Sequence, residues 1–141
     1  MYGDAIGAAP NTITGSIGVI GGWLYNQGLK ERMGLSTDHV QVGAHADLGF
    51  GMTVPLLGLS LPDRNLTEGE KGKMEHTIRI LYGNFVDKVA KGRGKSPEEI
   101  EALAQGRVWS GHAAVDRGLA DRLGGLDMAI QLAKEKAGIG I

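Results

Sequence analysis

Over its first half, the chain alternates short apolar segments with turn residues. The apolar segments Ala5–Ala9 and Ser16–Ile20 predict two short buried strands, with a turn at Pro10–Asn11 between them. Within Trp23–Met33 the apolar positions recur near helical spacing and charged residues occupy the other side. We therefore predict a helix there, ended by Gly34.

An extended segment, Val40–Val42, follows that helix. A strand, a helix and a strand in this order favour a βαβ crossover in a parallel sheet. Residues 43–65 come next as a long irregular segment, whose middle, Val54–Leu61, is apolar without helical periodicity. We expect this middle either to pack on its own domain or to contact another subunit.

Helical spacing dominates the second half of the chain. Thr67 and Glu70 form a capping box that opens a long helix with one apolar stripe, which ends at Arg93–Gly94. The other predicted elements are a helix opened by Ser96 and Pro97 that ends at Gly106, a strand at Arg107–Trp109, a short helix capped by Ser110 that reaches Arg117, and a last helix from Leu126 to about Lys136.

Composition narrows the possible functions. The 141 residues fit one domain or a large part of one, and an apolar segment begins so early that we expect a larger domain entered partway. A net charge of −1 gives no basic excess for nucleic acid. No apolar run reaches the roughly 18 residues of a membrane span. Four histidines and no cysteine leave no thiolate zinc site or thiol nucleophile, and we expect neither metal nor cofactor.

The segment Thr12–Ile20 carries three hydroxyl side chains among apolar residues and glycines. Ile17 favours a strand, while Gly15 and Gly18 allow another backbone to approach closely. A buried strand with a hydroxyl beside glycines often borders a reactive centre. The alternative is that Ser16 only satisfies hydrogen bonds of a strand end or turn.

Motifs along nearly the whole chain resemble the signal peptide peptidase A family of membrane-bound Ser/Lys peptidases. They are Pro10–Val19, Gly43–His45, Asn84–Gly94, Ala104–Gly111, Ala113–Asp121 and Leu123–Ile130. One such motif is weak, but several in the family's order are strong. The resemblance implies that residues 1–141 are the C-terminal part of one peptidase domain, with a strand-rich portion at 1–65 and a helical portion at 66–141.

The resemblance also implies a fold and a function. The fold is α/β of the ClpP/crotonase type, a βαβ spiral with helices packed outside a mostly parallel sheet. The function is a serine endopeptidase that degrades cleaved signal peptides at the extracytoplasmic (periplasmic) face of the cytoplasmic membrane, held by an anchor upstream of this chain. An extended apolar peptide would bind by strand addition beside Ile17 and Gly18. Family members assemble into rings, so we expect a homo-oligomer and no nucleic acid.

The family's chemistry uses a serine nucleophile and a lysine base whose pKa is lowered by burial. By resemblance, Ser16 matches the supporting hydroxyl that orients the lysine, and the nucleophilic serine should precede Met1. The lysine should directly follow Gly43–His45, but that position is Ala46. We therefore expect the chain alone to be inactive.

Two explanations account for Ala46. In long family members, which are tandem duplications, one half gives the serine and the other gives the lysine, so Ala46 fits a C-terminal half; an engineered knock-out is the alternative. His45 has a suitable ordinary pKa of about 6.5 for a base. Since no carboxylate partner can be assigned from the sequence, we expect His45 to be structural. We expect Asp116, Asp121 and Asp127 to be solvated caps.

Other classes of function stay open. A non-catalytic scaffold or assembly domain on the same fold would agree with Ala46. Phage capsid-maturation peptidases share the fold and are possible relatives. An acyl-CoA enzyme of the crotonase type would need an upstream oxyanion loop and a catalytic carboxylate, and the sequence has no signature for either.

Overall fold

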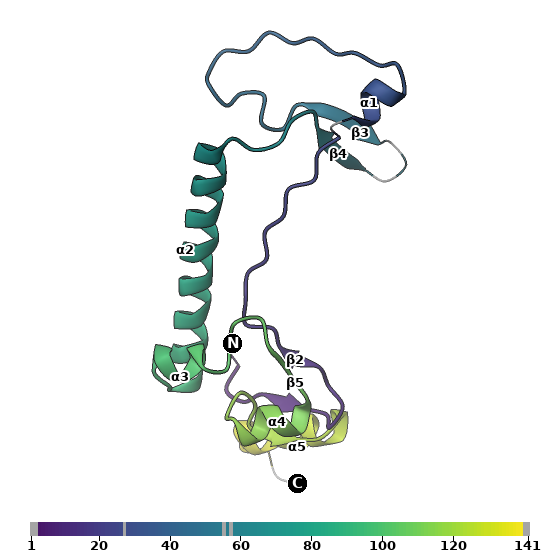
Figure 1. Cartoon of the computed structure of the whole chain (residues 1–141). Coiled ribbons are helices and arrows are strands. Elements are labelled where there is room, and N and C mark those ends of the chain that lie inside the picture. Colours follow the sequence, from purple (N-terminus) through teal and green to yellow (C-terminus); the bar gives the residue numbers. More distant parts are fainter. Residues whose placement is uncertain (1–2, 27, 55, 57, 140–141) are drawn as a thin grey trace. The chain divides into compact units, whose positions relative to one another are not determined.

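The computed structural model describes residues 3–139 except 27, 55 and 57. It forms two compact units, each described here by itself. Unit 1 combines the chain up to Val19 with the chain from Ile78 onward, and unit 2 is Ile20–Thr77. The long helix α2, Glu68–Arg93, contributes its first residues to unit 2 and the rest to unit 1 (Figure 1). The expected portions 1–65 and 66–141 stay a prediction.

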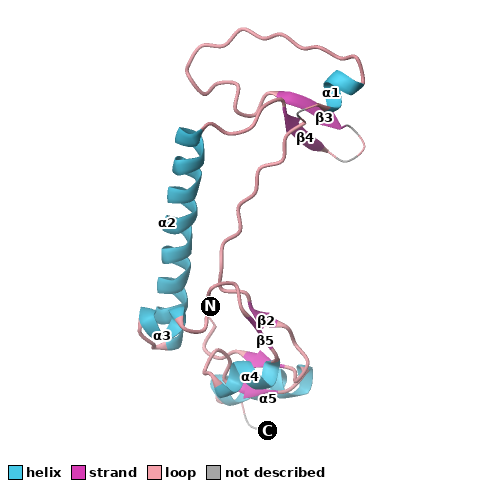
Figure 2. Cartoon of the chain, viewed as in Figure 1, coloured by secondary structure: helices cyan, strands magenta, loops and turns pink. Residues whose placement is uncertain are grey.

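Unit 1 pairs strands that lie far apart in the sequence. β1 (Gly7–Ala8) pairs in parallel with β6 (Arg122–Leu123), and β2 (Thr14–Gly15) pairs antiparallel with β5 (Val108–Trp109). Unit 1 also contains two short helices, α3 (Pro97–Glu101) and α4 (Gly111–Asp116), and a longer one, α5 (Leu126–Ala137) (Figure 2). Unit 1 is therefore a mixed α/β structure.

One apolar cluster forms the core of unit 1. Its largest fully buried side chains are Ile17, after β2, Val89 in α2 and Ile100 in α3. The other buried members are Ala8, Val86, Ala90, Ala104, Ala114, Leu119 and Ala120. The predicted apolar stripe of α2 is buried only near its C-terminal end, at Val86 and Val89, whereas Leu81 is exposed.

Local capping chemistry sets the helix starts, as the sequence predicts. The Ser96 hydroxyl accepts a hydrogen bond from the Glu99 N–H at 3.2 Å, and the Glu99 carboxylate accepts one from the Ser96 N–H at 2.8 Å. The Ser110 hydroxyl accepts from the Ala113 N–H at 3.3 Å and opens α4. The last helix, α5, also begins at the predicted Leu126. These predictions are confirmed.

The end of α3 differs from the prediction. The helix stops at Glu101 instead of Gly106. Gln105 and Gly106 both have positive φ, 60° and 74°, which turns the chain away from the helix path. The Gly106 N–H then donates to the Ile17 carbonyl at 3.0 Å, which joins this turn to the segment after β2.

Unit 2 contains a β-hairpin, a short helix and the first turns of α2. β3 (Gly51–Val54) pairs antiparallel with β4 (Leu59–Pro62). Residues 43–65, predicted to be irregular, therefore include a hairpin, and residues 55 and 57 of their apolar middle lie outside the described residues. A Cβ on Gly51 would lie 2.1 Å from the Leu61 carbonyl oxygen, so the close strand contact requires glycine.

Three predicted elements are wrong. Ser16–Ile20 is not a strand; the strand is β2, and it ends where Ser16 takes a positive φ of 49°. The helix predicted for Trp23–Met33 is reduced to α1 (Leu29–Arg32), because Gly28 has a left-handed backbone with φ 81° and α1 begins only after it. Val40–Val42 is not a strand either, and its two valine side chains are 100% and 95% exposed.

The predicted βαβ crossover is therefore absent from residues 5–42 as the structure describes them. Gly34 does end the helix: it has φ 69°, and the Leu35 N–H donates to the Lys30 carbonyl at 2.9 Å. Among the described residues, no helix is both long and apolar enough to cross a membrane.

Candidate active site

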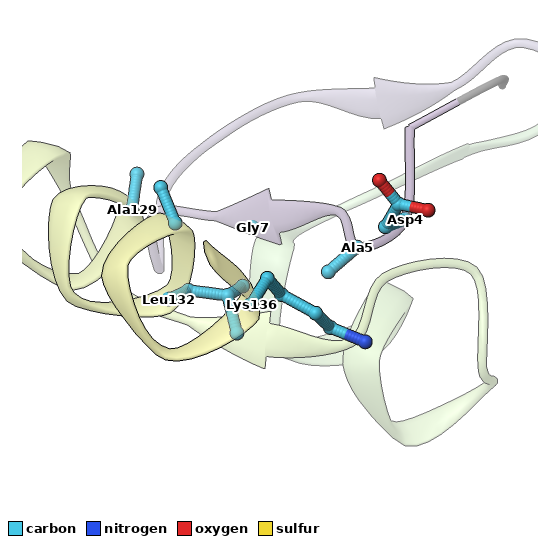
Figure 3. Close-up of a pocket in the computed structure, with 7 residues that line it drawn as sticks. Asp4, Ala5, Gly7, Ala129, Leu132 and Lys136 are labelled. Atoms are coloured by element: carbon cyan, nitrogen blue, oxygen red, sulfur yellow. The ribbon is translucent and has the colours of Figure 1, made fainter. Parts of the chain in front are cut away.

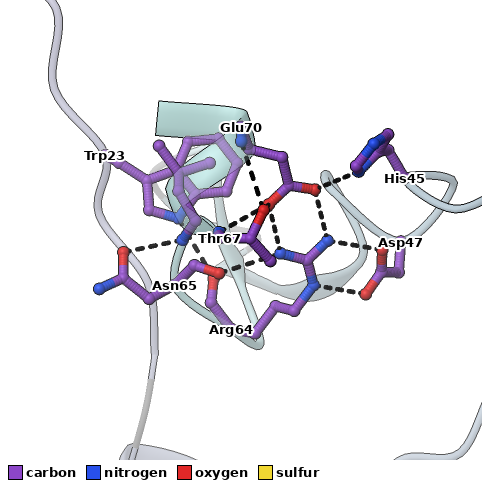
Figure 4. Close-up of polar contacts among 8 residues, drawn as sticks. Trp23, His45, Asp47, Arg64, Asn65, Thr67 and Glu70 are labelled. Atoms are coloured by element: carbon purple, nitrogen blue, oxygen red, sulfur yellow. Dashed lines mark hydrogen bonds and ion pairs between the residues drawn. The ribbon is translucent and has the colours of Figure 1, made fainter. Parts of the chain in front are cut away.

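Ala46, the position where the resemblance calls for a lysine, lies in unit 2 within a turn at residues 44–49 that precedes β3. Backbone hydrogen bonds close the turn: the Leu48 N–H donates to the His45 carbonyl at 3.2 Å, and the Phe50 N–H donates to the Asp47 carbonyl at 2.9 Å. The side chains on both sides of Ala46 join one polar cluster (Figure 4).

Arg64 is the centre of this cluster. Its Nε and Nη2 donate to the two Asp47 carboxylate oxygens at 2.5 and 2.7 Å. Its Nη1 and Nη2 donate to the two Glu70 carboxylate oxygens at 2.8 and 2.9 Å. The Trp23 indole also donates to the Arg64 carbonyl at 3.2 Å. Two bidentate ion pairs therefore connect the turn around Ala46 to the start of α2.

Glu70 is the buried carboxylate of the cluster, with a side chain 4% exposed. The Thr67 N–H donates to Glu70 Oε2 at 2.8 Å, and the Glu70 N–H donates to the Thr67 hydroxyl at 3.3 Å. These two bonds are the predicted capping box, which is confirmed. Glu70 thus both caps α2 and binds Arg64.

The charges of the cluster are fixed by these contacts. The Arg64 guanidinium, followed by the Thr67 N–H, holds the pKa of the Glu70 carboxyl well below its usual range. Arg64 likewise lowers the pKa of Asp47, while the two carboxylates raise the pKa of Arg64. Both carboxylates are therefore ionised near neutral pH and only accept hydrogen bonds.

His45 has the carboxylate partner that the sequence does not reveal. Its Nδ1 lies 2.7 Å from Glu70 Oε1, while its side chain is 48% exposed. The two residues are 25 positions apart, so no local motif identifies the pair. The only sequence signal was the capping box that places Glu70 at the start of α2.

Lys30 is a lysine of unit 2 that makes polar contacts with two other side chains. Its Nζ lies 2.5 Å from Asp63 Oδ2 and also contacts the Thr37 hydroxyl. Hydrogen bonds from Lys30, and then from Asn26, lower the pKa of Asp63 from 3.8 to about 2. These residues lie beside a cavity of about 320 Å³. Lys30 is thus engaged in an ion pair with Asp63 in the described structure.

Ser16, predicted as the supporting hydroxyl, lies in unit 1 directly after β2. Its φ of 49° is a left-handed conformation that is uncommon outside glycine, and Gly15 before it has φ 97°. The Ser16 N–H donates to the Arg107 carbonyl at 2.7 Å. The side chain is exposed, and within the described residues its hydroxyl makes no hydrogen bond. Its catalytic role stays a prediction.

Ile17 and Gly18, predicted to bind substrate, pack against the turn before β5. The Ile17 side chain is buried in the core, and its carbonyl accepts from Gly106. A Cβ on Gly18 would lie 2.9 Å from the Gly106 Cα, so glycine is required for this approach. Substrate binding at these two residues also stays a prediction.

Asp121 differs from the expected solvated cap. Its carboxylate pairs with both terminal nitrogens of Arg93 at 3.0 and 2.7 Å and accepts from the Ile6 N–H at 2.7 Å. Arg93 holds the pKa of Asp121 at about 2. The pair connects the end of α2 to the segment before β1. Asp127, by contrast, lies in the first turn of α5.

A second cavity, of about 220 Å³, lies in unit 1 between β1 and α5 (Figure 3). Its lining residues are Asp4, Ala5, Gly7, Ala129, Leu132, Ala133 and Lys136. They provide neither a hydroxyl nor an imidazole. The cluster around Ala46 is therefore the better candidate for proton-transfer chemistry.

Comparison with known proteins agrees with the resemblance. The model of peptidase family S49 matches residues 1–140. The chain is 37% identical over 139 residues to the chloroplastic serine protease SPPA of Arabidopsis thaliana, covering 99% of this chain and 19% of that protein. It is 34% identical over 134 residues to a putative signal peptide peptidase SppA of Enterococcus faecium, covering 94% and 36%.

Protease 4 of Salmonella typhi is a third relative, 35% identical over 130 residues that cover 92% of this chain and 19% of that protein. The chain thus spans between about a fifth and just over a third of the length of these relatives. Because the family model matches almost the entire sequence, the chain belongs to peptidase family S49.

Proposed function

We propose that this chain forms the C-terminal part of a serine endopeptidase domain that cleaves signal peptides with a Ser/Lys dyad. The observation that carries the proposal is the turn around Ala46, which the hydrogen bonds of Arg64 to Asp47 and Glu70 connect to the start of α2. Relatives named as a serine protease and a putative signal peptide peptidase support this activity. The corresponding proposal for the fold is a ClpP/crotonase-type spiral, of which the parallel β1–β6 pair would be one part.

The nucleophile in this proposal is a serine outside these 141 residues, and the lysine comes from another half or another copy of the protein. Ala46 cannot accept a proton, so the 141 residues alone are inactive. The exposed, left-handed Ser16 is the supporting hydroxyl that orients the lysine amine. An apolar peptide in extended form binds by strand addition along the segment that contains Ile17 and Gly18.

Exposed apolar side chains support a homo-oligomeric assembly. In unit 2 they include Ile20, Leu24, Val40, Val42 and Leu56. Large exposed apolar groups of this kind are normally covered by a partner or a membrane surface. We place the assembled enzyme at the extracytoplasmic face of the cytoplasmic membrane, with an anchor contributed from outside this chain.

The test uses the full-length product of the gene that encodes this chain. A synthetic signal peptide is incubated with the protein, and cleavage is followed by mass spectrometry. A fluorophosphonate probe then identifies the nucleophilic serine, and that serine is replaced by alanine. We expect cleavage that falls at least about 10³-fold in the alanine variant, since the nucleophile is lost.

A non-catalytic scaffold on the same fold is the second candidate, and Ala46 is the observation that favours it. A well-folded oligomer that neither cleaves the peptide nor reacts with the probe would contradict the peptidase proposal and support the scaffold.

A further inference from the structure

We propose that a cavity of unit 2 binds the carboxamide side chain of a glutamine or asparagine in the peptide substrate. The inference rests on the proposed peptidase function and deepens it by adding a specificity subsite to the segment of Ile17 and Gly18. The cavity has a volume of about 320 Å³, within the range of small-ligand sites. The lining residues that carry the argument are Asn26, Lys30, Glu31, Thr37 and Asp63.

Asn26 is fixed against β4 and has a defined orientation. The residue is 4% exposed, and its backbone N–H donates to the Pro62 carbonyl at 2.8 Å. Its side-chain Nδ2 donates to the Leu61 carbonyl at 2.8 Å and to Asp63 Oδ1 at 2.7 Å. Both partners of Nδ2 are oxygens that only accept, so the amide cannot be turned the other way round.

The carbonyl oxygen of the same amide, Oδ1, is an unused acceptor. It accepts no hydrogen bond within the described part of the chain. In that same part, every fully buried side-chain oxygen or nitrogen has a partner, so Oδ1 must keep some accessible surface. Buried polar groups normally have a hydrogen-bond partner, and Asn26 lines the cavity. The cavity is therefore where a partner for Oδ1 can bind.

Lys30 supplies a donor beside this acceptor. An ammonium has three N–H donors. One binds Asp63 Oδ2 at 2.5 Å and another binds the Thr37 hydroxyl, while the Lys30 side chain is 12% exposed. Among the described residues, the third donor has no partner. Because Asn26 and Lys30 bind the two oxygens of one carboxylate, the unused acceptor and the unused donor lie close together.

The charges around the cavity favour a neutral ligand. Lys30 and then Asn26 lower the pKa of Asp63 to about 2, so its carboxylate is ionised and neutralises the ammonium. Glu31 adds a second carboxylate to the lining, which disfavours an anion. A cation is disfavoured too, because the Lys30 ammonium already occupies the place beside Asp63.

A primary carboxamide matches this arrangement. Its carbonyl oxygen and one of its N–H groups lie on the same edge, so the oxygen can accept from Lys30 while the N–H donates to Asn26 Oδ1. In a trans peptide bond the corresponding two groups point to opposite sides. The cavity therefore favours the side chain of glutamine or asparagine over a single main-chain amide.

The experiment is a glutamine scan of a synthetic signal peptide, cleaved by the full-length protein. Each position in turn carries glutamine or methionine, which have similar lengths, and kcat/KM is measured for both. At one position we expect glutamine to be preferred about 5–50-fold, since a site built for hydrogen bonds rejects an analogue that lacks them. An asparagine series, run alongside, tells which of the two side chains reaches the cavity.

Variants of Lys30 locate the preference. Lys30→Met removes the donor, so the ratio of the two kcat/KM values should fall below about twofold. Lys30→Arg keeps a cation for Asp63 but changes the donor geometry, and the ratio should fall at least about twofold. Lys71→Met changes an exposed lysine of α2 and is the control, in which the ratio should persist. A general loss of stability lowers both rates and leaves the ratio unchanged.

The outcomes separate this inference from the peptidase proposal. Cleavage without a glutamine preference at any position, or with a preference that Lys30→Arg leaves intact or that Lys71→Met removes equally, overturns the subsite and leaves the peptidase proposal standing. Absence of cleavage of every peptide by the folded wild type overturns both.

Discussion

Different forces stabilise the two units of this protein, each within itself. Among the described residues, the ten buried apolar side chains that form the core all belong to unit 1, from Ala8 to Ala120. The buried polar residues in the same described part of the chain, Asn26 and Glu70, both belong to unit 2. Unit 1 is stabilised chiefly by removal of apolar surface from water, whereas unit 2 depends on ion pairs and hydrogen bonds.

The contrast has a functional consequence. In unit 2, polar contacts to Glu70 hold the side chains around Ala46 in position, and the His45 ring in this cluster stays half exposed. Unit 1 offers a rigid apolar body on which Ser16 keeps a strained backbone with φ 49°. The same polar construction makes unit 2 more sensitive to pH than unit 1.

The largest expected effect is a break in the core of unit 1. Ile100→Ala removes a fully buried side chain and should cost about 2–5 kcal/mol. Hydrogen exchange measured by mass spectrometry should show lost protection in α3 and in the C-terminal half of α2. Ile130→Ala, at a position 46% exposed on α5, is the control and should change protection little. Equal loss of protection in the β3–β4 hairpin would argue against a core confined to unit 1.

We expect acid to unfold unit 2 at a higher pH than unit 1. Asp63 has a folded pKa lowered from 3.8 to about 2, so its stabilising contribution is complete above 3.8 and is lost as the pH falls toward 2. Asp47 and Glu70, also in unit 2, have pKa values shifted in the same direction. In unit 1 Asp121 behaves like Asp63, but the apolar core does not titrate.

Residue-resolved hydrogen exchange across this pH range is the measurement. The account expects amides of the β3–β4 hairpin to lose protection at a higher pH than those of α4. Simultaneous loss in both units would mean that apolar packing and ion pairs are not divided between the units as described.

The smallest expected effect is the loss of the helix cap at the start of α2, in unit 2. Thr67→Ala removes a hydroxyl that binds Glu70 at 2.9 Å and caps the helix, with an expected cost of about 0.5–2 kcal/mol. The first turn of α2 should fray in hydrogen exchange, while Thr67→Ser should restore it. Thr77→Ala, inside the same helix, is the control. Unchanged protection in Thr67→Ala would show that Arg64 alone fixes Glu70.

The sequence predicts the elements of this fold whose signals are local. Three helices begin with a hydroxyl side chain that accepts a hydrogen bond from a residue three positions later, at Thr67, Ser96 and Ser110. A short stretch of sequence is therefore enough to predict these helix starts. The strands, in contrast, depend on partners that are distant in the sequence. Thr14 pairs with Trp109, and the strand ends at Ser16 because of a backbone angle that no side-chain pattern encodes.

The candidate site was predictable only in part. By resemblance, the motif Gly43–His45 leads to the prediction that Ala46 stands where the family has its lysine. The partner of His45 is not recognisable, because Glu70 is 25 residues away and its own motif indicates only a helix start. Only the tertiary folding of unit 2 brings His45 and Glu70 together.

The central claim for unit 2 is that the ionised Glu70 carboxylate accepts a hydrogen bond from His45 Nδ1 and so fixes the orientation of the ring. A long-range ¹H–¹⁵N correlation spectrum of the protein labelled with ¹⁵N-histidine, recorded near pH 8, reads the tautomer directly, with His76→Gln and His45→Gln for assignment. The account predicts that the neutral His45 ring is protonated at Nδ1 and bare at Nε2, and that Glu70→Gln removes this preference. A ring protonated at Nε2, or a preference unaffected by Glu70→Gln, would contradict the claim.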